Sequence, residues 1–157
     1  MNKRLIVGGA AAFVVIFNLG YVFHELVGAA FFRANFAPGV QRPSYNVPVI
    51  ALAFAIYVTL MGLAYPVAYS YFTERRAWSR VRTGALLGLY CGFLWDALQG
   101  GIIEYATYNV SLVAMLVDST YHLLEGILAG AIFGAFYRPT ERSASSRALG
   151  SGRHDPE

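Results

Sequence analysis

Ionisable residues at helical spacing occur in a segment of the chain that is otherwise apolar. Asp118, His122 and Glu125 follow an i, i+4, i+7 pattern, which places their side chains on one face of an α-helix. Carboxylates and imidazoles in such a setting can bind a proton, a metal ion or an organic cation. The pattern therefore predicts a cation-binding or proton-binding face within this helix.

Other apolar segments carry further ionisable residues that can join this face. The candidate ligand-binding or proton-binding residues are Asp96, His122, Asp118, His24, Glu25, Glu125 and Glu104. The apolar segments contain no Lys or Arg, so these carboxylates have no basic partner there. A charged group at the centre of a bilayer costs at least roughly 2.5 kcal/mol. We therefore expect some of these groups to be protonated, hydrated or bound to a cation.

Three functions are compatible with this set of residues. We favour a small transporter or permeation protein for protons, cations or a cationic small molecule. A metal-binding membrane enzyme is the second, because a mixed nitrogen and oxygen set suits zinc or iron; its candidate metal ligands are His24, Asp96, Asp118 and His122. A non-catalytic membrane subunit or assembly factor is the third. The sequence contains no HExxH, nucleotide-binding loop or nucleophile elbow, so an enzyme is not favoured, and a divalent metal ion is the one cofactor suggested.

Composition indicates the elements that must position these residues. Of 157 residues, 57% are hydrophobic and 13% are charged, which is not the profile of a soluble domain. A membrane-spanning helix needs roughly 20 mostly apolar residues, and the segments that qualify are 5–31, 47–72, 83–104 and 110–137. We expect an all-α membrane four-helix bundle forming one domain over residues 1–137, followed by a disordered cytoplasmic tail over 138–157.

The distribution of basic residues predicts the orientation. Ten of the twelve fall on one side of the expected membrane, namely Lys3, Arg4, Arg75, Arg76, Arg80, Arg82, Arg138, Arg142, Arg147 and Arg153. The positive-inside rule then makes both termini of this multi-pass protein cytoplasmic. Topology accounts for the net charge of +3, so we expect the lipid bilayer, and not nucleic acid, as a partner. A second copy or the other subunits of a membrane complex are the further partners expected.

The two halves of the chain share an order of motifs that indicates an internal duplication. "GYVFHELVG" precedes "YNVPVIALAFAIYVTLMG" and "TERR", and "GFLWDALQG" precedes "YNVSLVAMLVDSTYHLLEG" and "TER". The alignment pairs His24 with Asp96 and predicts two tandem transmembrane hairpins, over about 1–76 and about 77–142. Hairpins of the same orientation would be related by a pseudo-twofold axis along the membrane normal.

Glycines at every fourth position predict how the second hairpin packs. Small-residue ridges let helix backbones approach closely in lipid. With a turn near Asn109, facing positions sum to 218, and the predicted pairs are Gly84 with Gly134, Gly88 with Gly130, Gly92 with Gly126, and Asp96 with His122. Polar residues that could join the resulting pocket are Asn18, Tyr21, Gln99, Thr59 and Tyr121.

The motifs "YVFHELVGAAFF" and "RTGALLGLYCGFLWDALQGGIIEYATYNVSLVAMLVDSTYHLLEGILAGAIFGAFYR" cover much of the chain up to Arg138. In these motifs the chain resembles a group of small four-helix bacterial integral membrane proteins of unknown function. The resemblance implies a four-helix inner-membrane protein, and it implies no activity and no functional residues.

Overall fold

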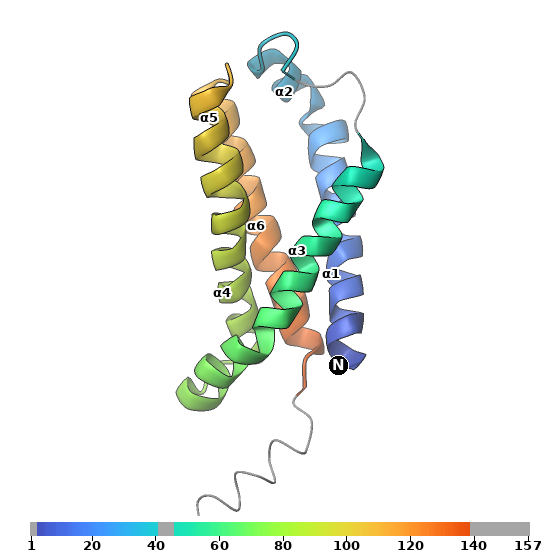
Figure 1. Cartoon of the computed structure of the whole chain (residues 1–157), viewed down its shortest axis with the longest axis vertical. Helices are drawn as coiled ribbons and strands as arrows, with labels where there is room; N and C mark the ends of the chain where they lie inside the picture. The colour runs from blue at the N-terminus through green and yellow to red at the C-terminus, as the bar shows by residue number, and fades with distance from the viewer. Residues whose placement is uncertain (1–2, 41–45, 139–157) are drawn as a thin grey trace, which may run out of the picture.

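The computed structural model describes residues 3–40 and 46–138, and every regular element in these residues is a helix. Four helical spans are long and apolar enough to cross a membrane, and they run side by side (Figure 1). They are Lys3–Val27, Val47–Glu74, Arg80–Thr107 and Leu112–Phe136. The prediction of four apolar spans is confirmed, with small shifts at their ends. The predicted tail lies, after Arg138, outside the described residues.

The first span departs from the continuous helix expected over 5–31. An α-helix, α1 (Lys3–Tyr21), runs into a π-helical segment, η1 (Val22–Val27), and a separate helix, α2 (Ala29–Asn35), follows. The chain bends at Gly28, where a Cβ would lie 2.6 Å from the Phe23 carbonyl oxygen and 2.8 Å from the ring of Phe32. The glycine therefore lets Phe32 pack back against η1, and this packing brings α2 over the end of the span.

The other three spans begin at capped residues, and the second and third also contain π-helical segments. The side chains of Asn46, Ser79 and Ser111 each accept a hydrogen bond from a backbone N–H in the first turn of a helix, which satisfies a donor that the helix itself cannot. The elements after these caps are α3 (Val47–Ala68) with η2 (Tyr69–Glu74), α4 (Arg80–Gly92) with η3 (Phe93–Ile103) and α5 (Glu104–Thr107), and α6 (Leu112–Phe136).

Facing glycines bring α4 and α6 into backbone contact, which confirms that the two glycine ridges pack together. The register differs from the predicted one. Each predicted partner is near, but the closest atoms belong to the residue one turn earlier in α6. A Cβ on Gly84 would overlap the carbonyl oxygen of Gly130, and a Cβ on Gly88 would overlap that of Gly126. A Cβ on Gly92 would lie 3.1 Å from the carbonyl oxygen of His122 and 3.5 Å from the Cα of Gly126. The glycines of α4 thus fit between those of α6, because a four-residue step does not match the 3.6-residue turn.

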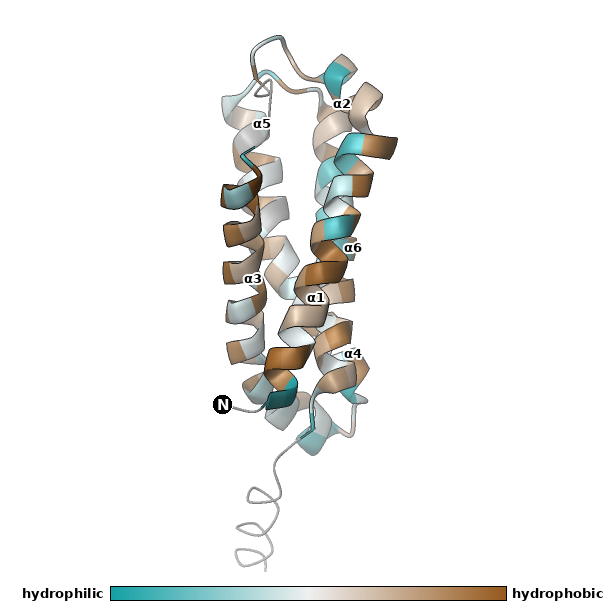
Figure 2. Ribbon diagram, turned by 90° about the vertical axis from the view of Figure 1, so that its right-hand side faces the viewer, coloured by the Kyte–Doolittle hydropathy of each residue, from teal (hydrophilic) through white to brown (hydrophobic). Residues whose placement is uncertain are grey.

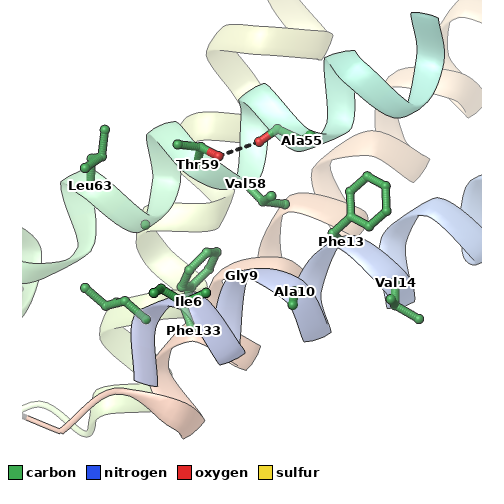
Figure 3. A pocket seen from close by; sticks show the side chains of 12 residues that line it. Ile6, Gly9, Ala10, Phe13, Val14, Ala55, Val58, Thr59, Leu63 and Phe133 are labelled. Carbon is green, nitrogen blue, oxygen red and sulfur yellow. Dashed lines mark hydrogen bonds between the residues drawn. The ribbon is translucent and has the colours of Figure 1, made fainter. Parts of the chain in front are cut away.

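The seam between α1 and α3 is looser than the glycine contact. An apolar pocket of about 420 Å³ lies between the two helices, with Phe133 of α6 at its base (Figure 3). Thr59 lines this pocket, but its hydroxyl donates to the Ala55 carbonyl oxygen of its own helix at 2.7 Å, as the dashed line in Figure 3 shows. The first and second hairpins therefore differ in how tightly their helices pack.

Large apolar side chains fill the centre of the molecule, where Ile16, Met61, Tyr65 and Phe133 are almost fully buried. Many other apolar side chains along the spans are exposed, as expected for helices that face lipid, and hydrophilic residues gather toward the ends (Figure 2). At the end that carries Lys3, the Tyr65 hydroxyl donates to the Arg80 carbonyl oxygen at 2.7 Å, and the Arg80 guanidinium donates to the Tyr137 carbonyl oxygen at 2.6 Å. These bonds tie α3, α4 and the end of α6 together.

The opposite end, which carries α2 and α5 (top of Figure 1), is closed by contacts between two connections. Phe36 and Val110 form an isolated antiparallel bridge, and the Ala37 N–H donates to the Asn109 carbonyl oxygen at 3.2 Å. The Ser111 hydroxyl and the Asn35 side-chain oxygen lie 2.9 Å apart. The turn predicted near Asn109 is confirmed, and it holds the start of α6 against the end of α2.

Candidate cation site

His24, Asp118 and His122 meet at the end of the molecule that carries α2 and α5. His24 comes from η1, and the other two residues come from successive turns of α6. Asp118 Oδ1 lies 3.6 Å from His24 Nε2 and 3.8 Å from His122 Nε2. Each residue offers one ligand atom, and the three atoms all lie within 4.8 Å of one another. We refer to these three residues as the triad.

A second carboxylate holds one imidazole of the triad in place. His122 Nδ1 lies 2.9 Å from Glu125 Oε2, and the Tyr121 hydroxyl donates to Glu125 Oε1 at 3.0 Å. Glu125 is 4% exposed, so its carboxylate is held by these side chains and not by bulk water. With Glu125 ionised and His122 neutral, Nδ1 of His122 donates to Glu125 and Nε2 directs its lone pair toward Asp118.

Asp118 provides the clearest sign that the triad is built for a ligand. Its Oδ1 atom is buried and has no hydrogen-bond partner among the described residues. Buried polar atoms are almost always paired, because an unsatisfied group costs about 1–3 kcal/mol and a charged one costs more. An ionised carboxylate oxygen beside two imidazole nitrogens is stabilised by a proton on either ring or by a metal ion between the atoms.

Aromatic rings orient the first imidazole. The ring of His24 lies between those of Phe32, at a centroid distance of 5.1 Å, and Tyr121, at 5.5 Å. Tyr121 in turn stacks on Phe23 with the rings 3.9 Å apart and nearly parallel. These contacts hold the ring of His24 with its Nε2 atom toward Asp118.

A pocket of about 610 Å³ opens beside the triad. His24, Asp118 and His122 line it together with Glu25 and Tyr21, and its remaining wall is mostly aromatic and aliphatic. No Lys or Arg is among the described residues that line it. A polar group on one wall of a mostly apolar concavity is the usual arrangement of a small-ligand site, and the signs of the side chains favour a cation.

The structure brings together much of the candidate set expected from the sequence. His24, Asp118, His122 and Glu125 form a chain of contacts in that order, and Glu25 lines the same pocket. Asp96 belongs to η3 and Glu104 to α5, but their side chains lie outside the described residues, so the predicted contact of Asp96 with His122 stays a prediction. Three of the four candidate metal ligands therefore form the triad.

The polar neighbours expected around the pocket have different positions. Tyr21 lines the pocket and Tyr121 supports Glu125, as expected. Thr59 was expected there but lines the separate apolar pocket between α1 and α3. Asn18 is exposed, and its side chain bonds the Val14 carbonyl oxygen of its own helix at 2.7 Å. The side chain of Gln99 lies outside the described residues.

Two features of the site were not expected from the sequence. Phe32 of α2 and Phe36, which follows α2, line the pocket, because the chain bends at Gly28 instead of continuing as one helix. The Tyr121–Glu125 contact is the other, although its four-residue spacing on one helix was visible. The short run of two phenylalanines after a glycine was the only sequence signal for the first feature.

Comparisons with protein-family models, curated proteins and solved structures gave no match to this chain. The chemistry of the site must therefore be argued from its own atoms. Two imidazole nitrogens and a carboxylate oxygen, supported by a buried second carboxylate, can hold a metal ion or pass a proton between neighbouring groups.

Proposed function

We propose that this protein is a small transporter or permeation protein that binds a cation in a pocket at one membrane face. The observation that carries the proposal is the buried Oδ1 atom of Asp118, which lies between the Nε2 atoms of two histidines and has no hydrogen-bond partner among the described residues. A polar group within an apolar span is costly and is generally retained for ion or proton handling.

The positions of the basic residues support an outward-facing pocket in the bacterial inner membrane. Lys3, Arg4, Arg75, Arg80 and their neighbours belong to the end of the molecule opposite the triad (Figure 1). The positive-inside rule assigns that end, with both termini, to the cytoplasm. The triad then faces the outside, where it can take a cation from the medium.

Matching local structure supports the proposal of a four-helix bundle built from two tandem hairpins. The sequence alignment pairs the stretch around His24 with that around Asp96, and each stretch is π-helical, in η1 and η3. Such segments are rare and occur frequently at functional sites. We propose that the duplication supplied both, and that two copies associate through the open α1–α3 side to enclose a pathway.

A metal-dependent membrane enzyme is the second candidate. The shape of the pocket favours it, because about 610 Å³ bounded largely by apolar side chains exceeds what one ion requires. Catalytic zinc sites commonly have three protein ligands and an open position for water or substrate. A substrate with an apolar body would fit beside the triad.

Flux through reconstituted liposomes tests the proposed function. Entrapped dyes for H⁺, K⁺ and Zn²⁺ would report which cation enters, and Asp118→Asn, which removes the charge but keeps the size, should lower that flux at least about tenfold. Thr59→Ala is the matched control, because Thr59 bonds only its own helix in a different pocket, and it should leave the flux unchanged. Flux no faster than in empty liposomes for all three ions would overturn the proposal.

A further inference from the structure

We infer that the cation bound by the triad is a divalent transition metal ion of the zinc class. Its ligands are His24 Nε2, Asp118 Oδ1 and His122 Nε2. The inference rests on the proposed function, because it names the ion that the proposed transporter takes. It also assigns a separate role to Glu125, which positions a ligand without touching the ion.

The ligand types select the class of ion. Calcium and magnesium prefer six or more oxygen ligands, whereas imidazole nitrogen combined with carboxylate suits zinc and its first-row neighbours. The triad supplies two imidazole nitrogens for one carboxylate oxygen. An alkali or alkaline-earth ion would leave both nitrogen lone pairs poorly used, so this composition disfavours them.

The spacing of the ligand atoms fits such an ion. Bonds of about 2.0–2.2 Å in a tetrahedral arrangement place neighbouring ligand atoms about 3.3–3.6 Å apart. The two distances from Asp118 Oδ1 are 3.6 and 3.8 Å, and the ligand atoms of the two histidines lie within 4.8 Å of each other. Side-chain rotations that draw the two imidazole nitrogens together would bring all three atoms to coordination distance.

The second ring nitrogen of His122 has the partner that metal-binding histidines usually have. A ligating imidazole almost always donates its other ring N–H to a carboxylate or carbonyl group, which fixes the tautomer and the ring orientation. His122 has this partner in Glu125 Oε2 at 2.9 Å, and Glu125 is itself held by Tyr121 at 3.0 Å. An ion pair with Glu125 alone would use only Nδ1 of His122. Here Nε2 of the same ring also faces Asp118, as a metal ligand would.

An access path completes the requirements for a metal site. The pocket beside the triad, about 610 Å³, is large enough for on the order of 20 water molecules at about 30 Å³ each. It therefore has room for a hydrated ion beside the ligands. The fourth coordination position faces this pocket, since the three protein ligands lie on its wall.

Equilibrium binding of Zn²⁺ and Co²⁺ to the purified full chain in mild detergent tests the inference without any transport step. After treatment with a chelator and dialysis against either ion, elemental mass spectrometry should find about one ion per chain. Bound Co²⁺ should give the intense visible absorption bands of a tetrahedral site. Substoichiometric metal in the unaltered protein would overturn the inference, whatever the variants do.

Matched variants separate the ligands from general attraction by negative charge. Asp118→Asn and Glu25→Gln each remove one carboxylate from the same pocket, but only Asp118 is a ligand. Asp118→Asn and His122→Ala should lose stoichiometric metal, and Glu25→Gln should retain it. Equal loss in Asp118→Asn and Glu25→Gln would contradict the ligand set. Circular dichroism and gel filtration of each variant would verify that it is folded.

Glu125→Gln has its own expected signature. Because Glu125 orients His122 and does not bind the ion, the variant should retain one ion per chain while its affinity falls about 10- to 100-fold. Affinity equal to that of the unaltered protein would contradict the positioning role. Stoichiometric metal binding without flux in liposomes would support the metal site and contradict the proposed transport function. Flux of H⁺ or K⁺ without metal binding would support transport and contradict the metal site.

Discussion

At the scale of single residues, Glu125 and Tyr121 hold the His122 ring in its orientation. The Glu125 carboxylate is 4% exposed, and both of its oxygens are engaged, one by His122 and the other by Tyr121. Removing one partner of a buried charged group costs more than the net worth of the bond, since the charge remains in an apolar setting. The hydroxyl of Tyr121 therefore stabilises the fold as well as the geometry of His122.

Tyr121→Phe isolates that hydroxyl. The ring stacking on Phe23 should persist, and the loss of the hydrogen bond to Glu125 should lower the free energy of unfolding by about 1–3 kcal/mol. Thermal unfolding in detergent, followed by circular dichroism, would measure the change. Tyr21→Phe is the control, because Tyr21 lines the same pocket and is 58% exposed, and an equal loss of stability in the two variants would contradict the assignment.

At the scale of elements, the helices pack by two different means. The α4–α6 pair is held by interleaved glycines whose backbones touch, whereas side chains and a pocket separate α1 from α3. In lipid, close packing drives helix association and the hydrophobic effect contributes little. The α4–α6 pair should therefore be the most sensitive part of the molecule to added volume.

Gly88→Ala and Gly9→Ala test this difference between the seams. A Cβ on Gly88 would overlap the Gly126 carbonyl oxygen, so the helices must separate, at a cost of about 1–3 kcal/mol. A Cβ on Gly9 would meet only the ring of Phe133, at 3.4 Å, and this contact is tolerable. Unfolding measurements should show destabilisation for the first variant and little change for the second, and the opposite order would refute the packing argument.

Asn35→Ala tests how the end near the triad is closed. Asn35 and Asn18 each bond a carbonyl group four residues earlier in their own helix, but only Asn35 also contacts Ser111, at the start of α6. Asn35→Ala should therefore lower the free energy of unfolding by about 1 kcal/mol more than Asn18→Ala does. Equal effects in a thermal unfolding experiment would show that the contact with Ser111 contributes nothing.

At the scale of the whole molecule, most of the basic residues lie at one end and the triad lies at the other. A membrane-impermeant maleimide applied to intact bacterial cells would test the proposed orientation, in a Cys91→Ala background without a native thiol. Tyr108→Cys, near the turn before α6, should be labelled from outside, and Arg75→Cys only after permeabilisation. The reverse labelling pattern would contradict the proposed orientation and place the pocket on the cytoplasmic side.

Apolar length and ionisable spacing in the sequence were sufficient to predict the four spans and the face shared by Asp118, His122 and Glu125. The helix register was harder to predict, because the α4–α6 contact depends on how glycines interleave and not on which residues are opposite in a drawn hairpin. The bend at Gly28 was missed because an uninterrupted apolar segment predicts one continuous helix. The packing of the Phe32 ring beside Gly28 leaves no signal in that pattern. The aromatic wall of the pocket depends on that bend.

The interleaved glycines have a mechanical consequence for how an ion could leave the site. Backbone contact leaves α4 and α6 little room to slide or tilt against each other, whereas α1 and α3 border the open pocket between them. Asp118 and His122 belong to α6, and His24 belongs to η1, which contacts α6 through the stacking of Phe23 on Tyr121. A displacement of η1 from α6 would therefore withdraw one of the three ligands, and it would have to break that stacking first.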